Sequence, residues 1–204
     1  MSVPYREEEA VAAAPIDWIN PPGRRWTYEQ VKDLDLPFDF DLVDGEIVPR
    51  GMTSHWHNTV RDKLYLHLEL ARRAPFAVNS EQCVLIDEYN PPKPDVVVFD
   101  KAGLNVFSLE CLPVASVSLA VEVVSPGSRS DDRFRKPGLY AEAGIPYFWR
   151  VERGTDDLPE VFEFWLDREA GVYTPAPGGG HHVRTLKTEL PFPVEINLQR
   201  LVEL

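Results

Sequence analysis

Apolar runs in the middle of the chain predict a series of β-strands. Each run holds four to eight residues rich in Val, Ile, Leu and aromatic side chains, which is typical of strands. We expect strands over residues 76–79, 82–87, 94–99, 117–124 and 146–151. Residues 160–204 then alternate apolar and polar positions, with Gly178-Gly179-Gly180 as a hairpin loop. The tail therefore predicts further β-hairpins.

Apolar positions with helical spacing predict the other elements. Val60, Leu64 and Leu68 recur every four residues and so share one helix face. Gly144 follows another such stretch, at the place where glycine commonly ends a helix. We expect helices over residues 28–34, 54–74 and 129–143, with a last helical turn near residues 198–204.

A tight hairpin is expected near the N-terminus. Residues 40–43 and 46–48 are short apolar segments on either side of Asp44-Gly45. That pair readily adopts the positive φ angles of a two-residue turn. With the strands and helices above, the chain predicts an α/β (α+β) fold, in which a central mixed β-sheet is flanked by helices and followed by extra C-terminal β-hairpins. We expect one domain over residues 26–204 and a loosely ordered arm over residues 1–25.

Composition and charge narrow the function classes. The chain has 204 residues, of which 44% are hydrophobic, and a net charge of −12. This is an ordinary globular composition, but the charge argues against a protein that coats nucleic acid through bulk attraction. A local basic groove remains compatible with it, because four basic residues lie close together at Arg129, Arg133, Arg135 and Lys136.

The sequence predicts a cytoplasmic protein. The first residues include Glu7-Glu8-Glu9 where a secretory signal needs a basic flank and an apolar stretch. No apolar run approaches the roughly 20 residues that span a bilayer, so we expect no membrane segment. Cys83 and Cys111 show no metal-binding spacing, and we expect buried free thiols in a reducing compartment.

Two acidic residues stand inside strand-like apolar runs. Asp95 opens the run Val96-Val97-Val98-Phe99, and Glu122 interrupts the run of residues 119–124. Ionised carboxylates are rarely buried unless they are paired or bind a metal ion. If the runs are neighbouring strands, both carboxylates can lie at one edge of the sheet, where they suit Mg²⁺ (or Mn²⁺), and the backbone carbonyl of Val123 offers another oxygen.

Lys136 is the basic residue placed to reach this pair of acids. From Glu122 the strand runs on by about 7 Å, at about 3.3 Å per residue. A helix that starts near Ser130 and folds back covers about 9 Å by Lys136, at about 1.5 Å per residue. The ammonium group can therefore return to the level of Glu122. Pro137 disfavours helical angles at Lys136, so we expect either a kink there or a helix that starts at Pro137.

An ordered set of motifs resembles the PD-(D/E)XK, or restriction-endonuclease-like, superfamily and, within it, the large bacterial Uma family. The set comprises residues 42–46, His57, Pro94-Asp95-Val96, residues 121–126, the Asp132/Lys136/Tyr140 register and residues 143–149. The resemblance extends from about residue 40 to the C-terminus. The chain departs from the superfamily in one respect: the usual lysine lies two residues after the second acid, where this chain has Val124.

The resemblance implies a Mg²⁺-dependent endonuclease that hydrolyses DNA with a metal-activated water. It implies that Asp95 and Glu122 hold the metal ion with the Val123 carbonyl, and that Lys136 orients or deprotonates the water. Glu46 and His57 are then supporting residues. Many enzymes of the superfamily cut two strands as homodimers, so a homodimer is expected by analogy.

Simpler interpretations remain open from the sequence. Glu122 could form a structural ion pair with Arg133, and Lys136 could pair with Asp132 one helical turn away. The protein as a whole could be a non-catalytic binding or scaffold protein that retains the fold. It could also hydrolyse RNA or a small nucleotide, which suits a net charge of −12 better than long duplex DNA does.

Overall fold

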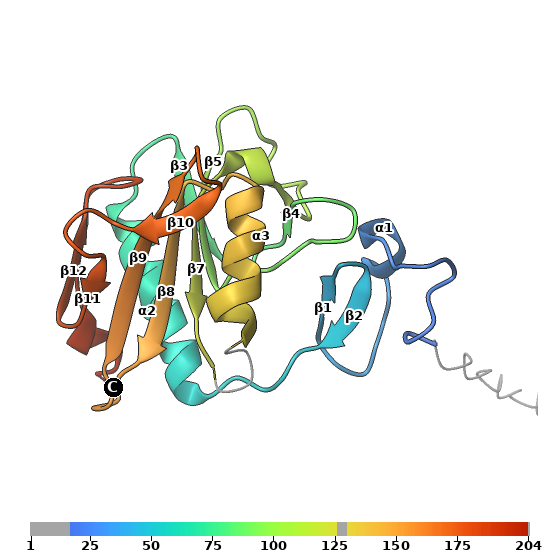
Figure 1. Cartoon of the computed structure of the whole chain (residues 1–204), viewed down its shortest axis with the longest axis horizontal. Coiled ribbons are helices and arrows are strands. Elements are labelled where there is room, and N and C mark those ends of the chain that lie inside the picture. The colour runs from blue at the N-terminus through green and yellow to red at the C-terminus, as the bar shows by residue number, and fades with distance from the viewer. Residues whose placement is uncertain (1–16, 126–129, 204) are drawn as a thin grey trace, which may run out of the picture.

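A mixed β-sheet forms the centre of the protein (Figure 1). The structure, a computed structural model, describes residues 17–125 and 130–203. The strand order is β10-β9-β8-β7-β5-β3, and β11 also pairs with β9. β7 and β8 run parallel, and the other neighbours are antiparallel. The strands are β3 (Phe76–Ser80), β5 (Val96–Asp100), β7 (Val117–Val123), β8 (Tyr147–Arg153), β9 (Pro159–Asp167), β10 (Val172–Pro175) and β11 (His181–His182). The predicted central mixed sheet is confirmed.

A helix covers each face of the sheet. α2 (His55–Ala71) packs on one face through Val60, Leu64 and Leu68, as their spacing predicts. α3 (Lys136–Glu142) lies on the opposite face, where Tyr140 packs against the other side of the strands (Figure 1). Successive residues of the buried strands pack alternately against the two helices, because neighbouring side chains on a strand point to opposite sides of the sheet.

Additional β structure follows the sheet. β12 (Thr185–Thr188) and β13 (Val194–Asn197) form an antiparallel hairpin, and a 3-10 turn, η3 (Leu198–Leu201), follows it. Apolar side chains of all three elements join the core on the α2 side. The extra C-terminal hairpin and the last helical turn are therefore confirmed.

The loop of three glycines differs from its prediction. All three have positive φ, as a tight turn requires, but β10 and β11 do not pair with each other. Both pair with β9 along the edge that β8 leaves free. The chain bulges between them around Glu163, whose N–H donates to the carbonyl of Gly180. The predicted hairpin loop is wrong because the turn connects two strands that share one partner.

A small N-terminal unit lies beside the sheet (Figure 1). It contains α1 (Tyr28–Val31), β1 (Phe40–Val43) and β2 (Glu46–Pro49), and its core includes the buried residues Trp26, Val31, Leu42 and Ile47. Asp44 and Gly45 have φ angles of 49° and 77°, which confirms the predicted turn. The segment from Arg50 to Ser54 leads from this unit to α2.

The two cysteines form a disulfide, so the predicted free thiols are wrong. β4 (Val84–Leu85) pairs in parallel with β6 (Leu112–Pro113), and Val84 stands opposite Leu112. The residue before each, Cys83 and Cys111, then has its Cα 4.5 Å from the other, within the range for a disulfide. Disulfides persist mainly in oxidising environments. The two cysteines therefore no longer support the expectation of a reducing compartment.

Some expectations fall partly outside the described residues. Residues 1–16 of the expected arm lie outside the described residues, and so do Pro126, Arg129 and Leu204. Of the arm's other residues, Trp18 packs against Phe38 with their ring centroids 5.1 Å apart. In the described part of the chain, none of the helices has the length and apolar character that crossing a membrane requires.

Candidate active site

Sheet register brings Asp95 and Glu122 to the same place. β5 runs antiparallel to β7, with Val96 opposite Val121. Asp95 directly precedes β5 and therefore lies beside the C-terminal end of β7. Its Oδ2 accepts a 2.7 Å hydrogen bond from the N–H of Val123, the residue after Glu122. Only 5% of Asp95 and 1% of Glu122 is exposed, so two strand acids are buried at one edge of the sheet.

Lys136 reaches Glu122 from α3. Its Nζ lies 2.9 Å from Glu122 Oε2 and 3.1 Å from Asp132 Oδ1. The other oxygen of Glu122, Oε1, accepts a 2.6 Å hydrogen bond from the hydroxyl of Tyr140. The ion pair of Lys136 with Asp132 that the simpler interpretation expects is present, but Lys136 also forms an ion pair with Glu122. Glu122 does not pair with Arg133, which instead binds Glu152.

A π-helical turn accommodates Pro137. Residues 131–135 form this wider turn, in which the N–H of Lys136 donates to the carbonyl of Asp131, five residues back. Lys136 itself has helical angles, with φ −61° and ψ −44°. α3 thus begins at Lys136, one residue before the start at Pro137 that was one of the two expected alternatives, and a π-helical turn takes the place of an irregular lead-in. Such π turns often occur at functional sites.

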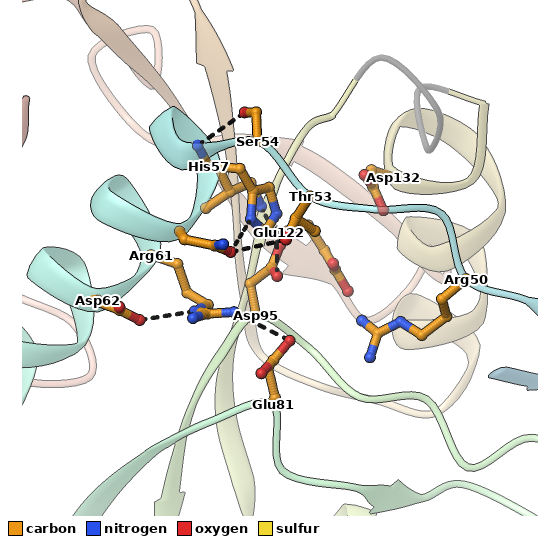
Figure 2. A network of polar contacts seen from close by, with 12 residues as sticks. Arg50, Thr53, Ser54, His57, Arg61, Asp62, Glu81, Asp95, Glu122 and Asp132 are labelled. Atoms are coloured by element: carbon orange, nitrogen blue, oxygen red, sulfur yellow. Dashed lines mark hydrogen bonds and ion pairs between the residues drawn. The ribbon is translucent and has the colours of Figure 1, made fainter. Parts of the chain in front are cut away.

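His57 holds the other acid. Ser54 Oγ accepts the N–H of His57 and so fixes the first turn of α2 (Figure 2). The imidazole Nε2 then lies 3.3 Å from Asp95 Oδ1, and 4% of the residue is exposed. Asp95 is thereby bound on one oxygen by His57 and on the other by the backbone of Val123.

Two arginines lie on opposite sides of the acids (Figure 2). Arg50 Nε is 3.5 Å from Asp41 Oδ2, and Arg61 forms a 3.1 Å ion pair with Glu81. Sequence reasoning assigned Arg50 no role, because an arginine after a short surface strand carries no recognisable signal. Its position depends on how the N-terminal unit packs beside the sheet, which no local pattern contains.

The two acids lie in a cavity of about 190 Å³ that Lys136, His57 and Arg50 also line. Its polar lining is formed by Asp41, Arg50, Thr53, His57, Asp95, Glu122, Ser125, Asp131, Asp132 and Lys136. Val123 lines it as well, whereas Glu46 does not and is exposed at the start of β2. The structure thus brings together Asp95, Glu122, Val123, Lys136 and His57, and it places Asp41 of the same hairpin where Glu46 was expected.

Burial and mutual repulsion change the acidity of these groups. Burial raises the pKa of Glu122 to about 8, with Asp132 and Asp95 adding to the effect and Lys136 opposing it. Burial alone would lower the pKa of Lys136, but the negative charges of Glu122, Asp132 and Asp95 raise it above its usual value. Burial would raise the pKa of Asp95, but its contact with His57 holds that pKa below the usual value.

The donor set fits a divalent cation. In the described residues, three carboxylates (Asp95, Glu122 and Asp132) are buried around the single ammonium of Lys136. Across residues 17–125 and 130–203, no three or more His, Cys, Asp or Glu side chains are already arranged to hold a metal ion. Mg²⁺, however, usually needs only one or two carboxylates and keeps several waters. Asp95 and Glu122 match that number, and a cation beside them would offset the carboxylate repulsion that adds to the effect of burial on the pKa of Glu122.

Comparisons with known proteins show the family of the chain and a solved structure with a similar fold. The sequence profile of the Uma2 family, described as "Putative restriction endonuclease", matches residues 27–202. A search of curated proteins finds no match. A similar solved structure is that of "a putative nuclease belonging to DUF820" from Anabaena variabilis, with a TM-score of 0.64 and 13% sequence identity. The match covers 86% of this chain and 96% of the Anabaena chain, and at this identity it shows a shared fold.

Proposed function

Because this chain belongs to the Uma2 family, we propose that it is a nuclease that hydrolyses phosphodiester bonds in DNA with the help of Mg²⁺ or Mn²⁺. One observation carries the proposal: Lys136 Nζ lies 2.9 Å from Glu122, in the same buried cavity as Asp95. Two carboxylates at one sheet edge can hold a metal ion that polarises a phosphodiester and activates water, and an amine beside them can orient that water.

Each residue of the cavity has a distinct role in this proposal. Asp95 and Glu122 hold the ion with the carbonyl of Val123, and His57 keeps Asp95 in position. When bound, the ion supplies a Lewis acid for the phosphate and lowers the pKa of a water molecule. Lys136 is paired with carboxylates and is therefore a cation, which favours orienting the water over removing its proton.

Arg50 supports a substrate with a phosphate group. Arg50 directly follows β2 of the small N-terminal unit, and it lines the cavity. Its Nε lies 3.5 Å from Oδ2 of its counter-ion Asp41. Arginine matches the geometry of phosphate oxygens and cannot lose its charge at neutral pH. We propose that Arg50 neutralises the phosphate next to the ion, so that the cavity accepts an anion despite its carboxylates.

A binding role without catalysis is the second candidate. It is favoured by the bonds that Glu122 already makes, since Lys136 occupies one carboxylate oxygen and Tyr140 the other. A metal ion would have to displace or share one of these partners. Under this candidate the cluster stabilises the fold, and the chain binds neither Mg²⁺ nor Mn²⁺ at Asp95.

Nicking of supercoiled plasmid DNA tests the proposed function. We expect nicked circles to accumulate with Mg²⁺ or Mn²⁺ and to disappear when EDTA removes the ion, because the carboxylates alone cannot activate water. Single-stranded DNA, duplex DNA and RNA assayed side by side identify the substrate. Glu122→Gln, purified identically, controls for contaminating nucleases: equal nicking by this variant and the wild type contradicts the proposal.

A homodimer is part of the proposal only by analogy with enzymes that cut both strands. Sedimentation of the protein with and without a DNA duplex would measure it directly. Double-strand breaks from a monomer would remove this part of the proposal and leave the chemistry of the site unchanged.

A further inference from the structure

A second cavity lies between α3 and the sheet, on the flank away from the carboxylates. Its volume is about 310 Å³, within the usual range of small-molecule sites. Gly138 and Ala141 line it from α3, and Phe148, Phe164 and Tyr173 line it from β8, β9 and β10. In Figure 1, β10 lies at the edge of the sheet beside α3.

The aromatic residues of this cavity form a stack. The ring centroids of Phe148 and Phe164 are 5.9 Å apart with an interplanar angle of 24°, and those of Phe148 and Tyr173 are 5.4 Å apart at 29°. The Tyr173 hydroxyl donates to the carbonyl of Ile145 over 2.8 Å, which fixes its ring. Phe148 is buried, so the half-buried rings of Phe164 and Tyr173, each nearly parallel to it, are the surface on which one more flat ring can stack.

Charged groups give the cavity two chemically different ends. Arg133 and Arg150 line it and both pair with the single carboxylate of Glu152, so their positive charge exceeds the negative charge of their partner. Glu142, the last residue of α3, is exposed at the other end of the helix. Arg133 belongs to the π-helical turn of residues 131–135, so the cationic end of the cavity lies at this turn, which also contains Asp131 and Asp132.

The cavity adjoins the candidate active site through α3. Lys136 lines the site with the carboxylates, whereas the next two residues, Pro137 and Gly138, line the aromatic cavity. The two cavities thus share the wall formed by the start of α3.

We propose that the aromatic cavity binds a nucleobase, with the nucleotide's phosphate at the Arg133 end. This inference rests on the proposed nuclease function and deepens it, because the base would belong to a nucleotide near the cleaved bond. A free nucleotide has the same chemistry and could occupy the same cavity. Stacking is sequence-tolerant, so the cavity would hold the strand without reading a long recognition sequence.

Gly138, an exposed residue of the cavity lining, offers a way to obstruct the cavity without disturbing the carboxylates. A Cβ added at this position meets no atom within 4 Å, and its φ is not in the positive region. Gly138→Leu therefore places a side chain in open space, and leucine is a better helix former than glycine. Gly138→Ala is the matched control, because it gives the same benefit to the helix and leaves most of the cavity empty.

Binding is measured by calorimetry in EDTA, so that the result does not depend on hydrolysis. The probes are the four deoxynucleoside 5′-monophosphates, a single-stranded DNA oligonucleotide and deoxyribose 5-phosphate, which lacks a base. We expect Gly138→Leu to weaken nucleotide or oligonucleotide binding about 5- to 150-fold, the range that stacking of one base gives, and Gly138→Ala to bind like the wild type.

Each outcome decides the proposal. Binding of the oligonucleotide but not of monophosphates, lost in Gly138→Leu, places a base of the strand in the cavity; binding of monophosphates as well means that free nucleotides enter. Equal binding by Gly138→Leu and the wild type overturns the proposal, and so does equal binding of deoxyribose 5-phosphate and the nucleotides, or no binding at all. Plasmid nicking with Mg²⁺ separately decides whether the nuclease function fails.

Discussion

Replacing Lys136 by methionine is expected to lower the rate of metal-dependent nicking by about 10²- to 10⁴-fold, the usual effect of removing a group that assists proton transfer or stabilises charge at the reacting centre. Methionine keeps the apolar stem and removes only the cation. That cation lies 2.9 Å from Glu122 and 3.1 Å from Asp132, so the substitution removes this ion-pair partner from both carboxylates. The measurement is the initial rate of nicking of supercoiled DNA with Mg²⁺ or Mn²⁺.

The same substitution affects stability, and the experiment must separate the two effects. Removing one partner of a buried ion pair can cost about 3–5 kcal/mol, because the remaining carboxylate is left unpaired. Here the cost is reduced by protonation of Glu122, since burial already raises its pKa to about 8. Thermal unfolding shows whether Lys136→Met is folded at the assay temperature.

Two further variants complete the test of Lys136. Lys187→Met removes a lysine that is exposed and pairs with Glu195 far from the cavity, so both stability and nicking should stay at the wild-type level. The double variant Glu122→Gln with Lys136→Met removes both charges and should be more stable than Lys136→Met alone. A folded Lys136→Met protein that nicks DNA at the wild-type rate shows that the lysine has no part in the chemistry.

Replacing Asp95 by asparagine is expected to weaken Mn²⁺ binding at least about 10- to 100-fold, since even outer-shell partners of metal ligands have effects of that size. Asparagine keeps the shape of the side chain, and its amide oxygen can still accept the N–H of Val123. The substitution therefore removes the negative charge and, with it, the ion pair with His57. Calorimetric titration with Mn²⁺ measures the change.

Glu46→Gln is the control for the Asp95 experiment. Glu46 is an acid of the sequence motif, but it is exposed and does not line the cavity, so its removal should leave Mn²⁺ affinity unchanged. Weaker binding by Glu46→Gln would restore the role that the sequence motif suggests. Wild-type Mn²⁺ affinity in Asp95→Asn would instead support the second candidate, a fold without a metal site.

The sheet and its acids could be predicted because local patterns contain them. Apolar runs identified the central strands, and Asp95 and Glu122 stood out because charged residues seldom interrupt such runs. Lys136 could be placed because helix and strand rises are fixed lengths, so a helix that folds back after β7 must return to the level of Glu122. The structure has these residues in contact.

Other features depend on contacts that the sequence does not display. The disulfide follows from the pairing of two strands of two residues each, which are too short for a recognisable pattern. The position of Arg50 follows from how the N-terminal unit packs beside the sheet. The π-helical turn could not be predicted because Pro137 is compatible with several backbone conformations of the preceding residues. The contacts of Lys136 with Glu122 and Asp132 favour one of them.

The central claim is that Asp95 and Glu122 share a divalent ion within reach of Lys136. Anomalous X-ray scattering from crystals soaked in Mn²⁺ tests it most directly. The account predicts an anomalous peak within about 2.0–2.3 Å of a carboxylate oxygen of each acid, at bond lengths usual for such ions. A well-occupied peak elsewhere, or no peak while Lys136 and Tyr140 still hold both oxygens of Glu122, contradicts it.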